Sequence, residues 1–191
     1  MEKFSQRIWK GCKVITTDAM GKAGDLAILW QPLIVTLSDG RANKFSITYN
    51  FSLPGIEVKG TLVKIYRPSV FPQKHSFFIF LEWRTGQAFT SSWVIGGDFN
   101  LIALLSENKG GKRDSDRFQE AFSEILTRSS LLDAETRNGW YTWKNKRGGS
   151  HLVASKLDRF LITEGISHGR GEVNSSVMPS AGSDHWPIIL H

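Results

Sequence analysis

Short apolar runs separated by turn residues dominate the first half of the sequence, and they limit this half to β-strands of a few residues each. Leu26–Trp30 and Leu33–Leu37 are two such runs, and both are rich enough in branched residues to predict strands. Ser38-Asp39-Gly40 follows the second run and predicts a turn. No apolar run approaches the roughly 20 residues that a membrane-spanning helix needs. Further strands are expected at Phe45–Tyr49, Leu62–Ile65 and Trp93–Ile95, with a turn at Pro54-Gly55.

The second half contains the clearest helical pattern. One apolar stripe with helical spacing consists of Phe118, Ala121, Phe122, Ile125 and Leu126. The Asp-Ser-Asp segment at 114–116 precedes this stripe, where capping oxygens and negative charge suit a helix N-terminus. A second helix is expected around Gln73–Trp83, although the run Phe77–Phe80 suits a strand equally well.

The remaining segments complete a mixed α/β pattern. Strands are expected at Trp140–Trp143, Leu157–Thr163 and Pro187–Leu190, and a long surface loop at Gly165–Gly182. Strands mixed with few helices predict two packed sheets with helices outside. The length of 191 residues suits a single domain, residues 1–191, with a sizeable core.

Composition narrows the cellular setting and the class of partner. Cys12 is the only cysteine, so an internal disulfide is excluded and a reducing compartment is expected. The first residues lack the continuous apolar stretch of a secretory signal, so the protein is expected to be soluble and intracellular. The formal net charge of +6 favours anionic partners such as nucleic acid, but many basic proteins bind none.

Three short clusters place a carboxylate or an imidazole on or beside a predicted strand. In Gly96–Asn100, the side chains of Asp98 and Asn100 can face the same way, and an Asp can orient or deprotonate water. The alternative is a simple Gly-Gly-Asp turn. Asp158 interrupts an apolar strand, either to meet a partner or because it faces water on an edge strand. Asp184 and His185 precede the last strand, and a pair of surface residues is an equally ordinary reading.

The order of these clusters resembles the endonuclease/exonuclease/phosphatase family. The sequence shows Gly-Asp-Phe-Asn at a strand end, then Leu-Asp-Arg-Phe, then Ser-Asp-His near the C-terminus. Three further segments are similar to the version found in plant LINE-type retrotransposons, and the resemblance extends from Trp9 to Leu190. These segments are Gly21–Gly24 with the strand that follows it, Gly139–Asn145 and Leu157–Leu161.

The resemblance implies a DNase-I-like sandwich of two mostly antiparallel β-sheets flanked by helices, and hydrolysis of phosphoester bonds with Mg²⁺ or Mn²⁺. It implies that Asp98 positions or deprotonates the attacking water and that Asn100 helps to hold this water and the phosphate. His185 then contacts the phosphoryl oxygen, with Asp158 as its paired carboxylate. The resemblance makes Tyr66 a phosphate contact and Asp184 a metal-linked carboxylate, with Asp98 as a second metal ligand.

Two basic loops bear on the choice of substrate. Lys144, Lys146 and Arg147 lie beside Trp143, and the resemblance places loops of this region near DNA. A solvated basic loop above aromatic core residues is an equally open reading. For the loop of Lys109, Lys112 and Arg113 the solvated reading is favoured. DNA is therefore the expected partner, without a membrane or a small-molecule cofactor, and a nuclear location follows only from that substrate. The sequence does not indicate an oligomeric state.

The chain departs from the family pattern at its N-terminus. The family begins with a strand that carries an Asn and a strand that ends in a metal-binding Glu, and we expect this chain to lack both. Glu2, Glu57 and Glu82 do not have the matching context. Losing a carboxylate ligand should weaken Mg²⁺ binding. Three hypotheses follow: a metal-dependent nuclease of retrotransposon origin that nicks DNA, a catalytically inactive remnant that binds nucleic acid, and a phosphatase of the same fold.

Overall fold

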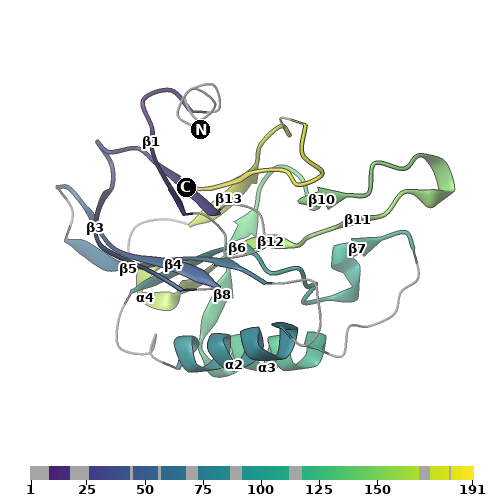
Figure 1. Cartoon of the computed structure of the whole chain (residues 1–191), viewed down its shortest axis with the longest axis horizontal. Helices are drawn as coiled ribbons and strands as arrows, with labels where there is room; N and C mark the ends of the chain where they lie inside the picture. The colour runs from purple at the N-terminus through teal and green to yellow at the C-terminus, as the bar shows by residue number, and fades with distance from the viewer. Residues whose placement is uncertain are drawn as a thin grey trace.

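A six-stranded sheet runs through the centre of the computed structural model (Figure 1). Neighbouring strands in it are antiparallel, apart from the parallel pair β5–β6. In spatial order the strands are β3 (Thr36–Ala42), β4 (Ser46–Leu53), β5 (Val58–Tyr66), β6 (Trp93–Asp98), β12 (Asp158–Thr163) and β8 (Leu131–Asp133). The structure describes residues 9–17, 26–43, 45–55, 57–67, 73–86, 92–111, 118–167, 173–180 and 182–191.

Smaller sheets cover one face of the six-stranded sheet. Strand β2 contacts β5, and β14 contacts β12. Strands β1 (Lys13–Thr17) and β2 (Leu26–Trp30) form an antiparallel pair. The other sheet of this layer has the order β14 (Ile188–Leu190), β13 (Asn174–Val177) and β9 (Glu135–Thr136). The layer therefore joins segments from both ends of the chain.

Helices cover the opposite face. Figure 1 shows α2 (Gln73–Thr85) and α3 (Phe118–Arg128) side by side beneath the sheet. The apolar stripe predicted for α3 packs inward, with Phe122 and Ile125 buried. Residues 77–80 are helical, so the strand reading of this segment was wrong. The remaining helical segments are α4 (Glu164–Ser167), η2 (Leu105–Glu107) and η3 (Gly149–His151).

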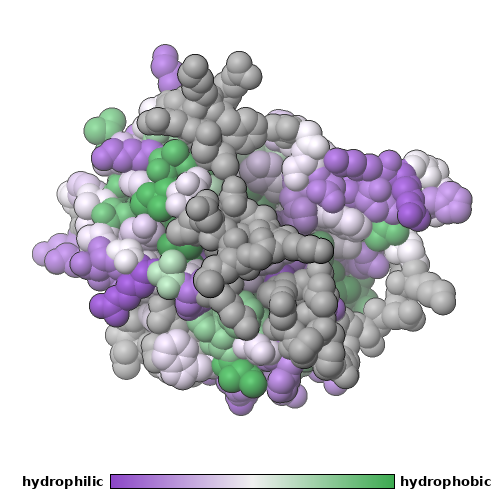
Figure 2. All heavy atoms as spheres, viewed as in Figure 1, coloured by the Kyte–Doolittle hydropathy of each residue, from purple (hydrophilic) through white to green (hydrophobic). Residues whose placement is uncertain are grey.

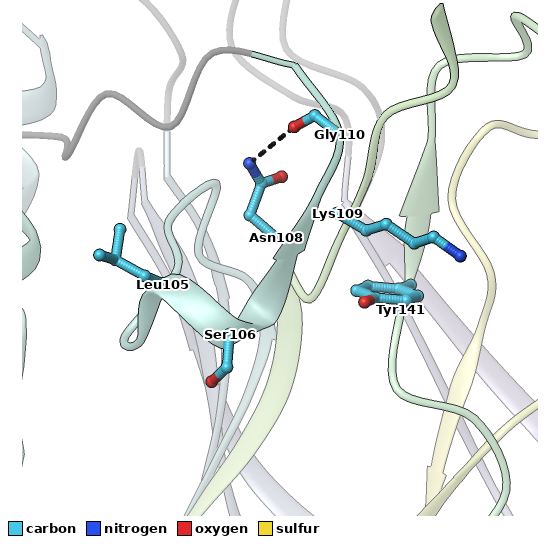
Figure 3. Close-up of a pocket in the computed structure, with 6 residues that line it drawn as sticks. All are labelled: Leu105, Ser106, Asn108, Lys109, Gly110 and Tyr141. Atoms are coloured by element: carbon cyan, nitrogen blue, oxygen red, sulfur yellow. Dashed lines mark hydrogen bonds between the residues drawn. The ribbon is translucent and has the colours of Figure 1, made fainter. Parts of the chain in front are cut away.

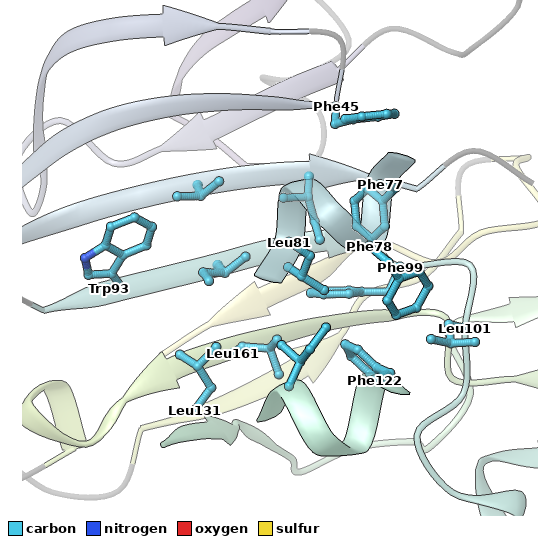
Figure 4. Close-up of a cluster of buried hydrophobic side chains, with 14 residues drawn as sticks. Phe45, Phe77, Phe78, Leu81, Trp93, Phe99, Leu101, Phe122, Leu131 and Leu161 are labelled. Carbon is cyan, nitrogen blue, oxygen red and sulfur yellow. The ribbon is translucent and has the colours of Figure 1, made fainter. Parts of the chain in front are cut away.

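The main core lies between this helical layer and the six-stranded sheet (Figure 4). Phe99 follows β6 and packs against Phe122 of α3, with their ring centroids 5.3 Å apart. Phe78 and Phe118 stack at 4.7 Å and join the two helices. Full burial of a phenylalanine side chain contributes about 1.5–3 kcal/mol to stability. This cluster therefore anchors the chain just beyond Asp98.

The third small sheet joins three two-residue strands, in the order β10 (Trp143–Lys144), β11 (Ala154–Ser155) and β7 (Asn108–Lys109). The segment between β10 and β11, residues 145–153, projects from the body at the right of Figure 1. We call residues 143–155 the basic hairpin.

The expected sandwich of mostly antiparallel sheets with helices outside is confirmed. The strands predicted at Leu26–Trp30 and Leu157–Thr163 and near Pro187–Leu190 are confirmed within one residue at each end. Cys12 is buried and is not part of a disulfide. Among the described helices, none combines the length and the apolar character needed to cross a membrane. The segments 21–24 and 114–116, and Lys112 and Arg113 of the second basic loop, were used in the predictions and lie outside the described residues.

Four local predictions were wrong. Residues 32–34 form a turn with Leu33 exposed, and Ser38-Asp39-Gly40 lies within β3, where a register shift absorbs the irregularity. The strand expected at Trp140–Trp143 is confined to β10. The loop expected at Gly165–Gly182 contains β13, a strand of two serines between Asn174 and Val177 that is held by pairing with β9 and β14.

Candidate active site

Three polar side chains stand in one row across the middle of the six-stranded sheet. Tyr66 of β5 aligns with Asp98 of β6, and Asp98 aligns with Asp158 of β12. Their sequence neighbours Ile65 and Arg159 are buried on the opposite face, because successive residues in a strand point to opposite sides. The row therefore faces away from the helices. Strand β6 continues through the two glycines to Asp98, so the alternative of a simple Gly-Gly-Asp turn was wrong.

His185 adds an imidazole to this row. Its Nδ1 lies 2.9 Å from Oδ2 of Asp158, and its Nε2 lies 4.0 Å from Oδ2 of Asp98. The hydrogen bond with Asp158 raises the pKa of His185 above its usual value, although partial burial acts in the opposite direction. Strand β12 lies between β6 and β8, so Asp158 is not an edge-strand residue facing water. The structure therefore joins residues from three distant clusters in one site.

The carboxyl group of Asp98 has an unusual titration. Burial raises its pKa to about 6, and the neighbouring charge of Asp158 acts in the same direction. His185 and the backbone N–H of Asn100 partly oppose this rise because they favour the ionised form. A carboxyl group with a pKa near neutrality suits a general base.

Asn100 holds Asp98 by both carboxylate oxygens. Its backbone N–H donates to Oδ1 at 2.8 Å and its side-chain Nδ2 donates to Oδ2 at 2.9 Å. Nδ2 also donates to the backbone oxygen of Arg67 at 2.8 Å, while the buried Arg67 guanidinium donates to the backbone oxygen of Asn100. The backbone of Asn100 is left-handed, with φ of 45°. Its amide hydrogens therefore orient Asp98 and the loop that follows β6.

Asp184 has a different environment from the other predicted site residues. It is exposed, and its Oδ2 accepts a hydrogen bond from Nε1 of Trp143 at 3.2 Å. Desolvation pushes its pKa up, but the Trp143 hydrogen bond and the charges of His185 and Lys146 outweigh this and lower it. The structure therefore places Asp184 beside the hairpin rather than within the donor cluster.

The site can supply donors to a divalent cation. Among the described residues, one carboxylate oxygen each of Asp98 and Asp158 and one ring nitrogen of His185 lie within 4.8 Å of one another. Carboxylate oxygens suit Mg²⁺ and Mn²⁺, and Mg²⁺ retains several waters and needs few protein ligands. The raised pKa of His185 favours its cationic form, which repels a metal ion. The two carboxylates therefore fit the ion, while the imidazolium suits an anionic substrate.

Thr142 is a site residue that the sequence predictions missed. Its buried Oγ1 accepts hydrogen bonds from the backbone N–H groups of Leu157 at 3.0 Å and Asp158 at 2.9 Å. Its backbone oxygen accepts from Trp186 N at 2.7 Å. A threonine between two aromatic residues has no periodic signal, so only the tertiary structure identifies this contact. Thr142 connects the segments that carry Asp158 and His185.

A buried ionic network lies beneath the row of carboxylates and was also missed. The guanidinium of Arg159 donates to both carboxylate oxygens of Glu107, at 3.0 and 2.8 Å, and to Asp133 at 2.7 Å. It also donates to the backbone oxygen of Leu101 at 3.1 Å. The network ties β12 to the segment that follows Asn100.

The basic hairpin is attached to the segment that carries His185. Trp143 forms an antiparallel bridge with His185, and Lys144 N donates to the backbone oxygen of Asp184 at 3.1 Å. The ammonium of Lys144 lies 4.4 Å from the centre of the Trp186 ring. Lys146 and Arg147 are exposed toward the tip, and Figure 2 shows this projection as a hydrophilic surface at the right.

A hollow of about 460 Å³ lies beside η2 and β7 (Figure 3). Lys109 and Tyr141 line it, together with the short segment of η2 and β7. None of Asp98, Asp158 and His185 lines this hollow. It is therefore separate from the carboxylate cluster.

Comparison with known proteins bears on the family and the fold of the chain. The profile of the Endonuclease/Exonuclease/phosphatase family matches residues 12–185, whereas no curated protein matches the sequence. Among solved structures, the endonuclease domain of TRAS1, a telomere-specific non-LTR retrotransposon, has a TM-score of 0.68 at 18% identity, covering 96% of this chain and 81% of its own.

Two other solved structures have the same fold with different titles. The AP endonuclease LMAP from Leishmania major has a TM-score of 0.69 at 15% identity, over 93% of this chain and 69% of its own. A mannosyl-6-phosphatase from Bacteroides thetaiotaomicron has a TM-score of 0.62 at 12% identity, over 99% of this chain and 79% of its own. These similarities establish the fold that the sequence resemblance predicted.

Proposed function

Because the chain belongs to the endonuclease/exonuclease/phosphatase family, we propose that it hydrolyses phosphodiester bonds of DNA at the site of Asp98, Asp158 and His185, with Mg²⁺ or Mn²⁺ as the cofactor. Members of this family are hydrolases that act on phosphodiester bonds. The observation that carries the proposal is the 2.9 Å hydrogen bond between His185 and Asp158 beside the raised-pKa carboxyl of Asp98.

The residues divide the chemical work as follows. In its ionised form, Asp98 accepts a proton from the attacking water, and Asn100 holds this carboxylate in position. The imidazolium of His185, favoured by Asp158, donates to a nonbridging oxygen of the phosphate, where negative charge develops. Tyr66 is a neutral donor in the same row. A divalent cation held by Asp98 and Asp158 would supply further positive charge to the transition state.

The basic hairpin supports DNA as the substrate. Lys144, Lys146 and Arg147 supply positive charge for phosphates, and Trp143 lies in the strand that bridges to His185. DNA held along the hairpin would have a phosphate close to the site. We propose Asp184 as a positioning residue for this hairpin through its bond with Trp143 rather than as a direct metal ligand. Similarity to the TRAS1 endonuclease domain supports descent from a retrotransposon endonuclease.

The first test is nicking of supercoiled plasmid by the full chain. We expect nicking with Mg²⁺ or Mn²⁺, and a loss of at least a hundredfold in Asp98→Asn and His185→Gln, because general acid–base groups contribute about 10²–10⁴-fold. Asp39→Asn and His75→Gln are matched controls at exposed positions away from the site, and they should retain the wild-type rate.

Plasmid that stays intact across metals and protein concentrations would exclude nuclease activity of this chain. Salt-sensitive retention on DNA without turnover would then identify a catalytically inactive DNA-binding protein.

A second candidate function is hydrolysis of small phosphate monoesters. Similarity to the mannosyl-6-phosphatase supports it, because the same arrangement of carboxylates and imidazole can act on a terminal phosphate. Release of inorganic phosphate from sugar phosphates by the wild type, but not by His185→Gln, would favour this function. Neutralising Lys146 and Arg147 distinguishes the two candidate functions. A small monoester does not reach these residues at the exposed tip, so its hydrolysis should not depend on their charges.

A further inference from the structure

Lys64 lies in the row of the sheet next to the row of carboxylates. It aligns with Gly96 of β6, which in turn aligns with Phe160 of β12. Residues two apart in a strand share a face, so Lys64 points to the same side as Tyr66. Val63 and Ile65, which flank it in sequence, are buried in the core on the helical side. Lys64 therefore belongs to the face of the site.

Along its own strand, Lys64 has the row of carboxylates on one side. The row on its other side is apolar and consists of Leu62, Val94 and Ile162. A Cβ added to Gly96 would lie 2.5 Å from the ring of Phe160, so this ring covers the glycine in the lysine's own row. Rows of one face are about 7 Å apart along a strand, a span that the four-carbon stem of a lysine can cover. The stem of Lys64 is therefore long enough to bring its ammonium group to the carboxylates.

The electrostatics agree with an ammonium group near the carboxylates. Burial lowers the pKa of Lys64, while the charges of Asp158 and Asp98 oppose this change by favouring the ammonium form. Lys64 in turn lowers the pKa of Asp98. The lysine therefore acts on both carboxylates that suit a metal ion.

We propose that Lys64 is the resident cation of this cluster and sets its affinity for divalent metal ions. Its positive charge opposes the entry of a second cation beside Asp98 and Asp158. The proposal takes the class of ligand, a divalent cation, from the proposed function, and it adds the residue that controls binding. At the effective dielectric constants found in proteins, a unit charge about 7 Å from a divalent ion changes the affinity for that ion by about tenfold or more.

Mn²⁺ binding to the purified full chain tests the proposal, with free Mn²⁺ measured by electron paramagnetic resonance. We expect Lys64→Met to bind Mn²⁺ at least tenfold more tightly than the wild type, and Lys64→Gln to do the same. Lys64→Arg retains the charge and should stay within twofold of the wild type. Lys59→Met removes a charge from an exposed position of the same strand and should also stay within twofold.

Unchanged or weaker Mn²⁺ binding in both folded neutral variants would overturn the proposal, and so would an equal gain in Lys59→Met. The readout requires no turnover, so it is independent of the nuclease assay. Tighter Mn²⁺ binding in Lys64→Met without plasmid nicking would sustain the role of Lys64 and reject the nuclease function. Plasmid nicking together with unchanged Mn²⁺ affinity would do the opposite.

Discussion

At the scale of single residues, Asp98 and His185 both titrate above their usual range, for different physical reasons. Burial and the nearby Asp158 raise the pKa of Asp98 to about 6, because they disfavour its anion. Asp158 raises the pKa of His185 because it favours the cation. The proposed mechanism needs Asp98 ionised and His185 protonated. One neighbouring carboxylate therefore adjusts both groups.

These shifts predict a bell-shaped dependence of hydrolysis on pH. Activity should rise as Asp98 loses its proton near pH 6 and should fall at higher pH, above the ordinary range of histidine, as His185 becomes neutral. Asn100→Gly keeps the left-handed backbone but removes the side-chain hydrogen bond, so the pKa of Asp98 should rise and the acid limb should move to higher pH.

The measurement is kcat/KM for plasmid nicking across pH 4.5–9 (about 0.5-unit steps, enough to resolve both limbs). Asn50→Ala serves as the control, because Asn50 is exposed and bonds to Asp39 on β3. An acid limb that stays fixed in Asn100→Gly would show that the Asn100 side chain does not set the ionisation of Asp98.

At the scale of elements, the basic hairpin is one body with the end of the chain that carries His185. Trp143 bridges to His185, and Lys146 Nζ donates to the backbone oxygen of Gly182 at 3.2 Å. The charges at the tip are nevertheless exposed to solvent. The hairpin therefore combines a fixed base with charged side chains that are exposed to a ligand.

Neutralising the charges at the tip should weaken DNA binding and reduce its dependence on salt concentration. For the double variant Lys146→Gln/Arg147→Gln, the slope of log Kobs against log salt should fall by about 1.8, because each phosphate contact contributes about 0.9. Filter binding of a duplex between about 50 and 200 mM salt measures this slope. The matched control, Lys10→Gln/Lys59→Gln, has the same change of net charge at exposed positions elsewhere. Equal slopes in the two double variants would assign the effect to net charge alone.

Sequence predicted elements well where periodicity was long and poorly where it was short. The stripe of α3 spans about two and a half helical turns, so its face was determined by the spacing. Leu33 and Ile34 look like strand residues but lie exposed in a turn that includes Pro32. An apolar run of five residues, such as Leu33–Leu37, is too short to distinguish a strand from a turn. Strand β13 consists mainly of polar residues, and only its distant partners β9 and β14 make it a strand.

At the scale of the whole molecule, one face of the central sheet carries the site and the other carries the buried ionic network. The row of Tyr66, Asp98 and Asp158 faces the site, and Arg159 on the reverse face is fully buried with Glu107. The family motifs predicted Asp98, Asp158 and His185 as site residues, and the structure brings these three side chains together. Their distances, and the contacts of Thr142 and Arg159, arise from strand register that no local pattern contains. The ionic network therefore could not be predicted from the sequence motifs.

Breaking this network should destabilise the whole fold. Glu107→Gln should lower the free energy of unfolding at pH 7 by about 3 kcal/mol, the lower end for breaking a buried ion pair, because Arg159 retains Asp133. Urea denaturation measures the change. The control Glu82→Gln removes an exposed ion pair with Arg128 and should cost less than about 1 kcal/mol.

The same variant has a predicted pH dependence. Burial pushes the pKa of Glu107 up, but its hydrogen bonds with Arg159 outweigh this and lower it in the folded state. The stabilisation is therefore present above the pKa of the unfolded chain and is lost as pH falls through the folded value. The difference between wild type and Glu107→Gln should shrink on acidification below about pH 4.5. A difference that stays constant down to pH 3 (roughly a unit lower) would contradict this linkage.

The bridge between Trp143 and His185 has a consequence for how such a protein can change. Insertions or deletions in residues 145–153 alter the outer end of the hairpin, which has no backbone bridge to the imidazole. A shift of one residue at 142–144 would instead move His185 and the Thr142 hydroxyl that accepts from the backbone N–H of Asp158. New target preferences are therefore accessible by lengthening or recoding the tip, whereas the three residues at its root must keep their spacing.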